Sequence, residues 1–254
     1  MWPDLTALAL PSLWLIFGTF LVAGTVKGVA GVGLPMTALG ILTFQTDPRT
    51  AVILAIVPIF LANLWQFLRA GDVRPALKRY LPFMAMMVPG IPLTLIWSAG
   101  VSQSLLMGVL GGVFVAFVLL NMTRWAPQLP DRFDFAGQLI FGALAGVLGG
   151  LTSLWLPAIV IYLSSRSTAK EEFVRATGLL LFAGSIPLFI TYVTEGYLTG
   201  PLTLLSAALM IPTIGGLWVG EQLRKRLSEE SFRKVLLFAF LLIGLNLIRR
   251  AFMN

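Results

Sequence analysis

Long apolar segments without charged residues are the feature that most restricts the fold of this chain. Residues 80–123 contain no Asp, Glu, Lys or Arg, and this length is enough for two membrane spans of about 20 residues each. Similar charge-free segments cover 28–46, 50–68, 135–165, 176–194 and 196–220. Only 11% of all residues are charged and 57% are hydrophobic, whereas a soluble domain carries about 25% charged residues. The sequence therefore predicts an all-α polytopic membrane protein.

Composition also excludes several classes of function. The chain has no cysteine and no histidine, so neither a disulfide framework nor a thiolate metal site is possible. The net charge of +7 does not indicate nucleic-acid binding, because the basic residues lie mainly in short loops between apolar segments, where the positive-inside rule places them. Met1-Trp-Pro-Asp4 supplies no basic region ahead of the first apolar segment, so we do not interpret it as a cleaved signal peptide.

A glycine-rich segment, Gly24–Pro35, divides the first apolar region into two pieces. We expect helices over about 12–26 and 34–45, each covering about 18–22 Å at 1.5 Å per residue. Neither length crosses a hydrocarbon core of about 30 Å. The sequence therefore predicts a re-entrant helical hairpin with Gly28–Gly33 at its tip, because glycine tolerates the backbone angles of a tight turn.

The second half of the chain repeats this order. A short pair over about 135–148 and 154–164 is followed by spans near 175–194, 201–219 and 232–250, as the first pair is followed by 50–68, 81–97 and 102–122. Residues 123–134 divide the halves. The pattern predicts two repeats, 1–126 and 127–254, each with a broken hairpin and three transmembrane helices. Prolines should kink the 81–97 span, namely Pro82, Pro89 and Pro92.

Basic loops predict the orientation in the membrane. Residues 69–80 and 219–234 are richest in Lys and Arg and should face the cytoplasm. Both loops can do so only if the second short pair crosses the membrane an even number of times, as a hairpin does. This parity makes the two repeats inverted relative to each other and places both termini in the periplasm, although Arg249 and Arg250 then lie outside, against the rule.

The same glycine pattern occurs in both halves of the chain and resembles that of a known protein family. G-x-x-x-G-x-x-G occurs at Gly24, Gly28 and Gly31, and again at Gly142, Gly146 and Gly149. Together with the short length, the two halves and Pro212-x-x-Gly215, it is similar to the sulfite exporter TauE/SafE family, over nearly the whole chain. The first tip, Val-Gly-Leu-Pro, departs from the family's fuller glycine run. The resemblance implies a bacterial inner-membrane exporter of sulfite, organosulfonate or a related small anion.

The two predicted tips are the candidate substrate site. Hairpins that enter from opposite faces would meet near the midplane, where unpaired N–H groups and the positive dipole end of each returning helix attract an anion. Lys27 adds a point charge, and Thr152 and Ser153 add hydroxyl donors. The candidate substrate-binding residues are Lys27, Gly28, Gly31, Gly33, Asn63, Gln66, Gly149, Gly150, Thr152, Ser153 and Trp155.

Each candidate also has a purely structural interpretation. Lys27 can extend to the cytoplasmic surface, the glycines can serve close helix packing, and Thr152 and Ser153 can cap the second arm. Trp155 can be a packing or interfacial aromatic, and Asn63 and Gln66 can join helices. Arg49 and Arg175 are expected to anchor their spans at the membrane surface.

Missing residue types separate the functional classes. No carboxylate lies deep in a predicted span, so a proton relay of the pump type has no candidate. Without His, Cys or an H-E-x-x-H motif, we expect neither an enzyme nor a metal or other cofactor. The expected partners are a small anionic substrate and lipid, with a homo-oligomer possible and no nucleic acid. The alternative is a carrier or channel for a cation or a neutral solute that binds to tip carbonyls.

Overall fold

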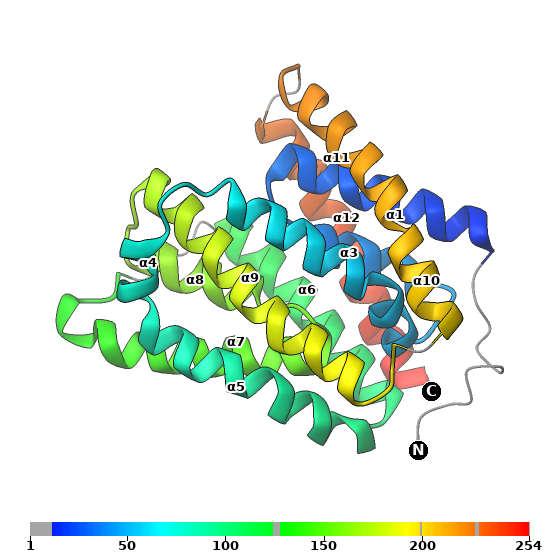
Figure 1. The fold of residues 1–254 in the computed structure, drawn as a ribbon, viewed down its shortest axis with the longest axis horizontal. Coiled ribbons are helices and arrows are strands. Elements are labelled where there is room, and N and C mark those ends of the chain that lie inside the picture. The colour runs from blue at the N-terminus through cyan, green and yellow to red at the C-terminus, as the bar shows by residue number, and fades with distance from the viewer. Residues whose placement is uncertain (1–11, 124–127, 199, 227–228, 254) are drawn as a thin grey trace. The chain divides into compact units, whose positions relative to one another are not determined.

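A computed structural model of the chain describes residues 12–123, 128–198, 200–226 and 229–253, without the side chains of 123, 170, 229 and 231. Within these ranges the regular structure is helical (Figure 1). The α-helices are α1 Leu13–Ala30, α2 Leu34–Leu42, α3 Pro48–Leu68, α4 Arg74–Arg79, α5 Leu81–Trp97, α6 Gln103–Thr123, α7 Asp134–Thr152, α8 Leu156–Ser165, α9 Lys170–Thr194, α10 Gly200–Ala208, α11 Met210–Arg224 and α12 Glu229–Met253. Eight segments of this described part are long and apolar enough to span a membrane. The all-α polytopic fold is therefore confirmed.

The long spans follow the sequence closely, with two differences. The helix predicted over 81–97 is α5, and it continues through Pro89 and Pro92. The helix predicted over 201–219 is instead two helices that meet at Leu209. Proline has no N–H for the carbonyl four residues earlier, and Pro212 therefore gives none to Ala208, the last residue of α10. The basic loop 69–80 also contains a short helix, α4, that the sequence did not predict.

Both predicted breaks are present, but the first arm of each pair is longer than predicted. Helix α1 has 18 residues and α7 has 19, so each extends about 27–29 Å at 1.5 Å per residue. The prediction that these arms end near 26 and 148 was wrong. Helix α1 continues through Gly28, and α7 through Gly149 and Gly150. Tertiary packing at these glycines outweighs their low helix propensity of about 1 kcal/mol each.

The chain forms two compact units, and each takes segments from both halves of the sequence. Unit 1 comprises Met1–Ile59, Gly100–Met122 and Gly196–Asn254; unit 2 comprises Phe60–Ala99 and Thr123–Glu195. Helix α3 belongs to unit 1 up to Ile59 and to unit 2 from Phe60. The assignment of 1–126 and 127–254 to two repeats stays a prediction.

A close pair of parallel helices organises unit 1. Glycines of α1 face glycines of α11, and a Cβ atom built on Gly28 would lie 2.9 Å from the Cα atom of Gly220. Likewise Gly24 meets the backbone of Gly216. Residue numbers rise together along this contact, so α1 and α11 run in the same direction with their backbones touching.

Unit 2 contains the corresponding pair, formed by α5 and α7. A Cβ atom on Gly146 would lie 3.0 Å from the Cα atom of Gly90, and one on Gly150 would lie 2.7 Å from the backbone nitrogen of Leu95. Earlier in both helices, Gly142 faces Phe83. This pair is also parallel. Each unit therefore joins the first arm of a broken pair to a helix from the other half of the sequence.

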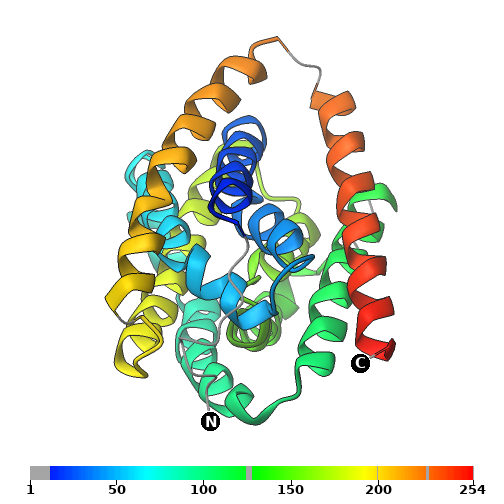
Figure 2. The same cartoon turned by 90° about the vertical axis from the view of Figure 1, so that its right-hand side faces the viewer.

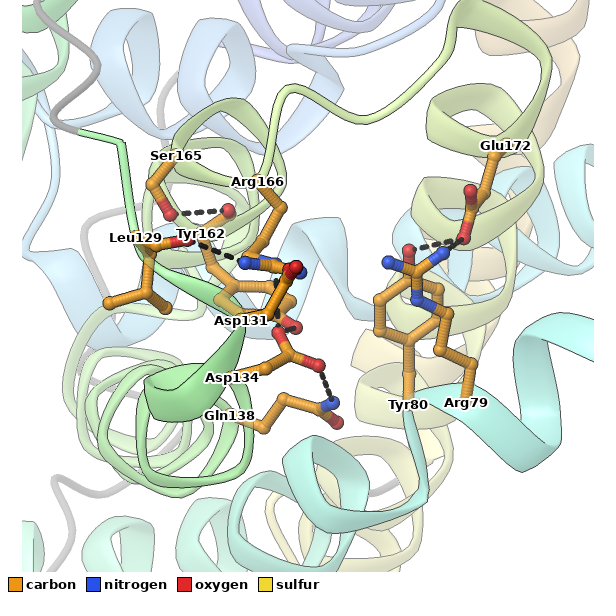
Figure 3. A network of polar contacts seen from close by, with 10 residues as sticks. All are labelled: Arg79, Tyr80, Leu129, Asp131, Asp134, Gln138, Tyr162, Ser165, Arg166 and Glu172. Carbon is orange, nitrogen blue, oxygen red and sulfur yellow. Dashed lines mark hydrogen bonds and ion pairs between the residues drawn. The ribbon is translucent and has the colours of Figure 1, made fainter.

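The α7–α8 pair of unit 2 is a hairpin, because its two ends are bonded to each other (Figure 3). The hydroxyl of Tyr162, late in α8, donates to Asp134 Oδ1 at 2.8 Å, at the first residue of α7. Arg166 contacts the carboxylates of Asp131 and Asp134 and donates to the carbonyl of Leu129 at 2.5 Å. The hydrogen bond to Asp131 raises the pKa of Arg166, so the guanidinium keeps its positive charge in this contact. Both ends of the pair lie on one side of unit 2.

In unit 1, α2 returns along α1 in the same way. Gly40 lies beside Ile243, and further along Arg250 donates to the carbonyl of Thr43, so α2 runs parallel to α12. In Figure 2 the chain ascends along α11, in orange, and descends along α12, in red, so these two helices are antiparallel. Because α1 is parallel to α11, helix α2 runs opposite to α1. The α1–α2 pair is therefore a hairpin as well.

Candidate functional site at the two helix breaks

The first break is a turn that only glycine makes without strain. Gly31 has a φ of 75° and Gly33 a φ of 99°, both in the left-handed region that side chains disfavour. The N–H of Gly31 donates to the carbonyl of Lys27 at 2.7 Å and ends α1. Pro35, in the first turn of α2, has no N–H to leave unpaired. Helix geometry gives the other N–H groups at the start of α2 no acceptor within the helix, up to Thr37, whose N–H donates to the carbonyl of Gly33 at 2.9 Å.

The candidates around the first break differ in their surroundings. Gly28 packs against the backbone of α11, whereas a Cβ atom on Gly31 would meet no atom within 4 Å. Lys27 lies one turn before the break and is only 6% exposed. Thr37, in the second turn of α2, has a buried hydroxyl without a hydrogen-bond partner among the described residues. The open side of the turn is therefore at Gly31 and not at Gly28.

The second break uses a serine where the first uses a glycine. Ser153 has a φ of 59°, a conformation that costs a non-glycine residue about 1–3 kcal/mol. Its N–H donates to the carbonyl of Gly149 at 2.9 Å. The hydroxyl of Thr152 donates to the carbonyl of Leu148 at 2.7 Å and accepts from the N–H of Leu154 at 3.3 Å. Thr152 thus holds the turn together.

Trp155 stands at the N-cap of α8 and carries the largest fully buried side chain of the described residues. The indole is 1% exposed and lies against Gly149 and against Gly184 of α9, where a Cβ atom would be 2.7 Å from Nε1. No described residue accepts a hydrogen bond from Nε1. A buried donor without an acceptor costs about 1–3 kcal/mol, so its retention requires a reason.

Helix α3 contacts α9 near two of its polar residues, Asn63 and Gln66. Asn63 Nδ2 donates to the carbonyl of Leu181 at 3.4 Å, within one turn of Gly184. The Oε1 atom of Gln66 is buried without a partner among the described residues, as is the hydroxyl of Thr177 on α9. Unit 2 therefore brings Asn63 and Trp155 to adjacent positions on α9. The sequence pattern did not single out Thr177 or Gly184, although Gly184 interrupts an apolar run.

The structure changes how the two breaks correspond. Spacing alone paired Gly31 with Gly149, but Gly149 is helical and the break begins at Ser153. Alignment on the breaks pairs Gly31 with Ser153, Gly33 with Trp155 and Lys27 with Gly149. The packing glycines then also coincide, since Gly24 and Gly28 fall on Gly146 and Gly150. The cation of the first break and the indole of the second thus have no counterpart at the equivalent position.

These features define the class of protein, a multi-pass helical membrane protein with two broken helix pairs. The family described as Sulfite exporter TauE/SafE matches residues 16–247 of the 254-residue chain. The chain belongs to this family, and the resemblance noted in the sequence is confirmed. An exporter is a transport protein, which agrees with the expectation that the chain is not an enzyme. No curated protein and no solved structure matches the chain.

Proposed function

We propose that the protein exports a small sulfur oxyanion, such as sulfite or an organosulfonate, by alternating access of two inverted repeats. Family membership supports export of an anion of this type. The polar groups at the breaks support an anion over a cation, because they are mainly donors: helix N–H groups, the indole N–H and the Lys27 ammonium. The membrane is the bacterial inner membrane, with the termini in the periplasm, although residues 1–11 and 254 lie outside the described residues.

The unpaired indole N–H of Trp155 is the observation that most supports the substrate assignment. Its buried Nε1–H has no protein acceptor in the described part of the chain, and it stands at the beginning of α8, where the helix dipole favours negative charge. An oxyanion there accepts the indole hydrogen bond and removes the cost of the unpaired donor. Lys27, buried one turn before the other break, is a second candidate for charge neutralisation. Use of both tips by one substrate stays a prediction.

Ligand-dependent thermal stabilisation tests the substrate class. A ligand that binds only the folded state raises the unfolding midpoint by mass action. We expect stabilisation by sulfite or short alkyl sulfonates and less by carboxylates of equal size. Stabilisation by inorganic cations or neutral solutes alone contradicts the proposal and favours the cation or neutral carrier.

The variant Trp155→Phe tests the role of the indole N–H, because it keeps most of the ring and removes the donor. Hydrogen bonds to charged groups contribute about 1.5–3 kcal/mol, so we expect anion affinity to fall about 10–100-fold. The matched control is Trp218→Phe, at a side chain that is 65% exposed, and its affinity should stay unchanged. Equal affinities in both variants mean that Trp155 serves packing alone.

A further inference from the structure

Proline leaves a carbonyl without its helical donor inside α3. Pro58 lies within this helix and has no N–H to offer the carbonyl four residues earlier, which is that of Leu54. Leu54 is fully buried, so water does not replace the missing donor. A buried carbonyl without a hydrogen-bond donor destabilises the folded state. The chain must therefore either tolerate this cost or supply a donor from elsewhere.

Ser206 of α10 supplies the donor. Its hydroxyl, 0% exposed, donates to the carbonyl of Leu54 at 2.9 Å and accepts from the N–H of Val57 at 3.3 Å. Other buried hydroxyls behave differently: those of Thr43 and Thr213 donate to carbonyls four residues earlier in their own helix. The Ser206 hydroxyl instead reaches another helix, at the carbonyl that Pro58 leaves open.

The contact joins an interrupted span of unit 1 to a continuous helix that contains a proline. Helix α10 is the first piece of a span that breaks at Leu209, and α3 leaves unit 1 after Ile59, the residue that follows Pro58. We propose that Ser206 is a positioning residue that replaces the hydrogen bond removed by Pro58 and couples α10 to a hinge in α3. The role of this hinge in transport rests on the proposed function, whereas the hydrogen-bond replacement does not.

A double-mutant cycle tests the replacement without any transport assay. In Ser206→Ala the Leu54 carbonyl loses its donor, and we expect the thermal midpoint of the purified protein to fall by about 2–4 °C. In Pro58→Ala the helical N–H returns to this carbonyl, so adding Ser206→Ala should then lower the midpoint much less. Ser185→Ala is the matched control, because that buried hydroxyl donates to the carbonyl of Phe182 in its own helix.

An equal effect of Ser206→Ala in the wild-type and Pro58→Ala backgrounds overturns the replacement. If Pro58→Ala does not fold, hydrogen exchange in the wild-type background takes its place. Ser206→Ala should then speed exchange of the α3 amides around residues 54–62, where the Leu54 carbonyl and the Val57 N–H lose their hydrogen-bond partner. Ser185→Ala should leave this segment unchanged. Unchanged exchange in Ser206→Ala also overturns the proposal.

Transport kinetics test the hinge. A loosened hinge changes the rate of interconversion and not the substrate contacts, so Ser206→Ala should change the maximal transport rate at an unchanged KM. If Ser206→Ala leaves the maximal transport rate unchanged, the hinge proposal is wrong, even if the double-mutant cycle supports the hydrogen-bond replacement. If wild-type protein transports none of the tested anions, the proposed function fails while the cycle still decides the role of Ser206.

Discussion

Lys27 combines a cationic side chain with burial inside an apolar helix. It is 6% exposed, whereas Arg69, at the end of the next span, lies over the ring of the half-exposed Trp65 at 4.4 Å. Burying a cation in a membrane span is costly, and such residues usually mark a ligand or ion path. This contrast makes Lys27 the stronger candidate for contact with an anion.

Substitution of Lys27 separates a ligand role from surface anchoring. We expect Lys27→Ala to weaken anion binding about 10–100-fold, corresponding to about 1.5–3 kcal/mol for a charge-assisted contact. Arg69→Ala, at an exposed cation–π contact, should leave affinity unchanged. Titration calorimetry on folded, monodisperse protein measures both. Small and equal effects would remove Lys27 from the site and leave the helix termini to hold the anion.

At the scale of single residues, the sequence locates one break better than the other. Gly31 and Gly33 adopt positive φ, as glycines in an apolar run indicate. The second turn falls on Ser153, which has no such signal, while the neighbouring Gly149 and Gly150 are helical. The sequence could not distinguish glycines that turn from glycines that pack. That distinction depends on which helix lies opposite, and only the fold determines it.

At the scale of the helix, two glycines of α1 make the difference testable. A Cβ atom on Gly28 would lie 2.5 Å from the carbonyl oxygen of Leu217, whereas one on Gly18 would meet no atom within 4 Å. We expect Gly28→Ala to destabilise the protein by about 1–3 kcal/mol, as overpacking does. Gly18→Ala should be neutral or stabilising by up to about 1 kcal/mol, because alanine favours helix.

Thermal unfolding of the two variants, each beside wild type, measures this difference. An unchanged midpoint for Gly28→Ala would mean that α1 and α11 separate easily and that their contact is weak. Equal losses in both variants would indicate a general intolerance of α1 to alanine and would remove the packing explanation.

Elements were predicted best where hydrophobicity alone sets them. The helix expected over 81–97 has those ends in the structure, because the apolar run and its flanking residues define it. The sequence analysis missed the break at Leu209, although Pro212 lies three residues later. Proline alone does not identify a break, because Pro89 and Pro92 lie within a continuous helix. A proline thus permits a break, and packing decides whether the helix takes it.

At the scale of the whole molecule, the sequence predicts the order of the helices but not their partners. It also predicted six full spans, whereas eight segments of the described residues are long and apolar enough to cross a membrane, because Leu13–Ala30 and Asp131–Thr152 reach that length too. Helix α1 packs on α11 and α7 packs on α5, so each close pair joins the two halves of the chain. The pairing of helices from different halves cannot be deduced from hydropathy, because all the candidate partner helices are apolar. The inverted repeats stay a prediction, in which α1 would correspond to α7 and α11 to α5.

Membrane topology is the prediction that the inverted repeats depend on. In unit 2, α4 and the start of α9 share one end, where Arg79 contacts Glu172 at 2.7 Å. Cysteines at the exposed positions Lys78 and Ala169 should therefore react from the same membrane face, the cytoplasm. A cysteine at Lys225, in the other basic loop, should react from that face too, and one at Ser102 from the periplasm.

The natural chain has no cysteine, so each signal comes from the introduced residue. Labelling of intact cells with an impermeant maleimide measures the exposed face. If Lys225→Cys and Lys78→Cys react from opposite sides, the second hairpin does not return as proposed, and the two halves are not inverted.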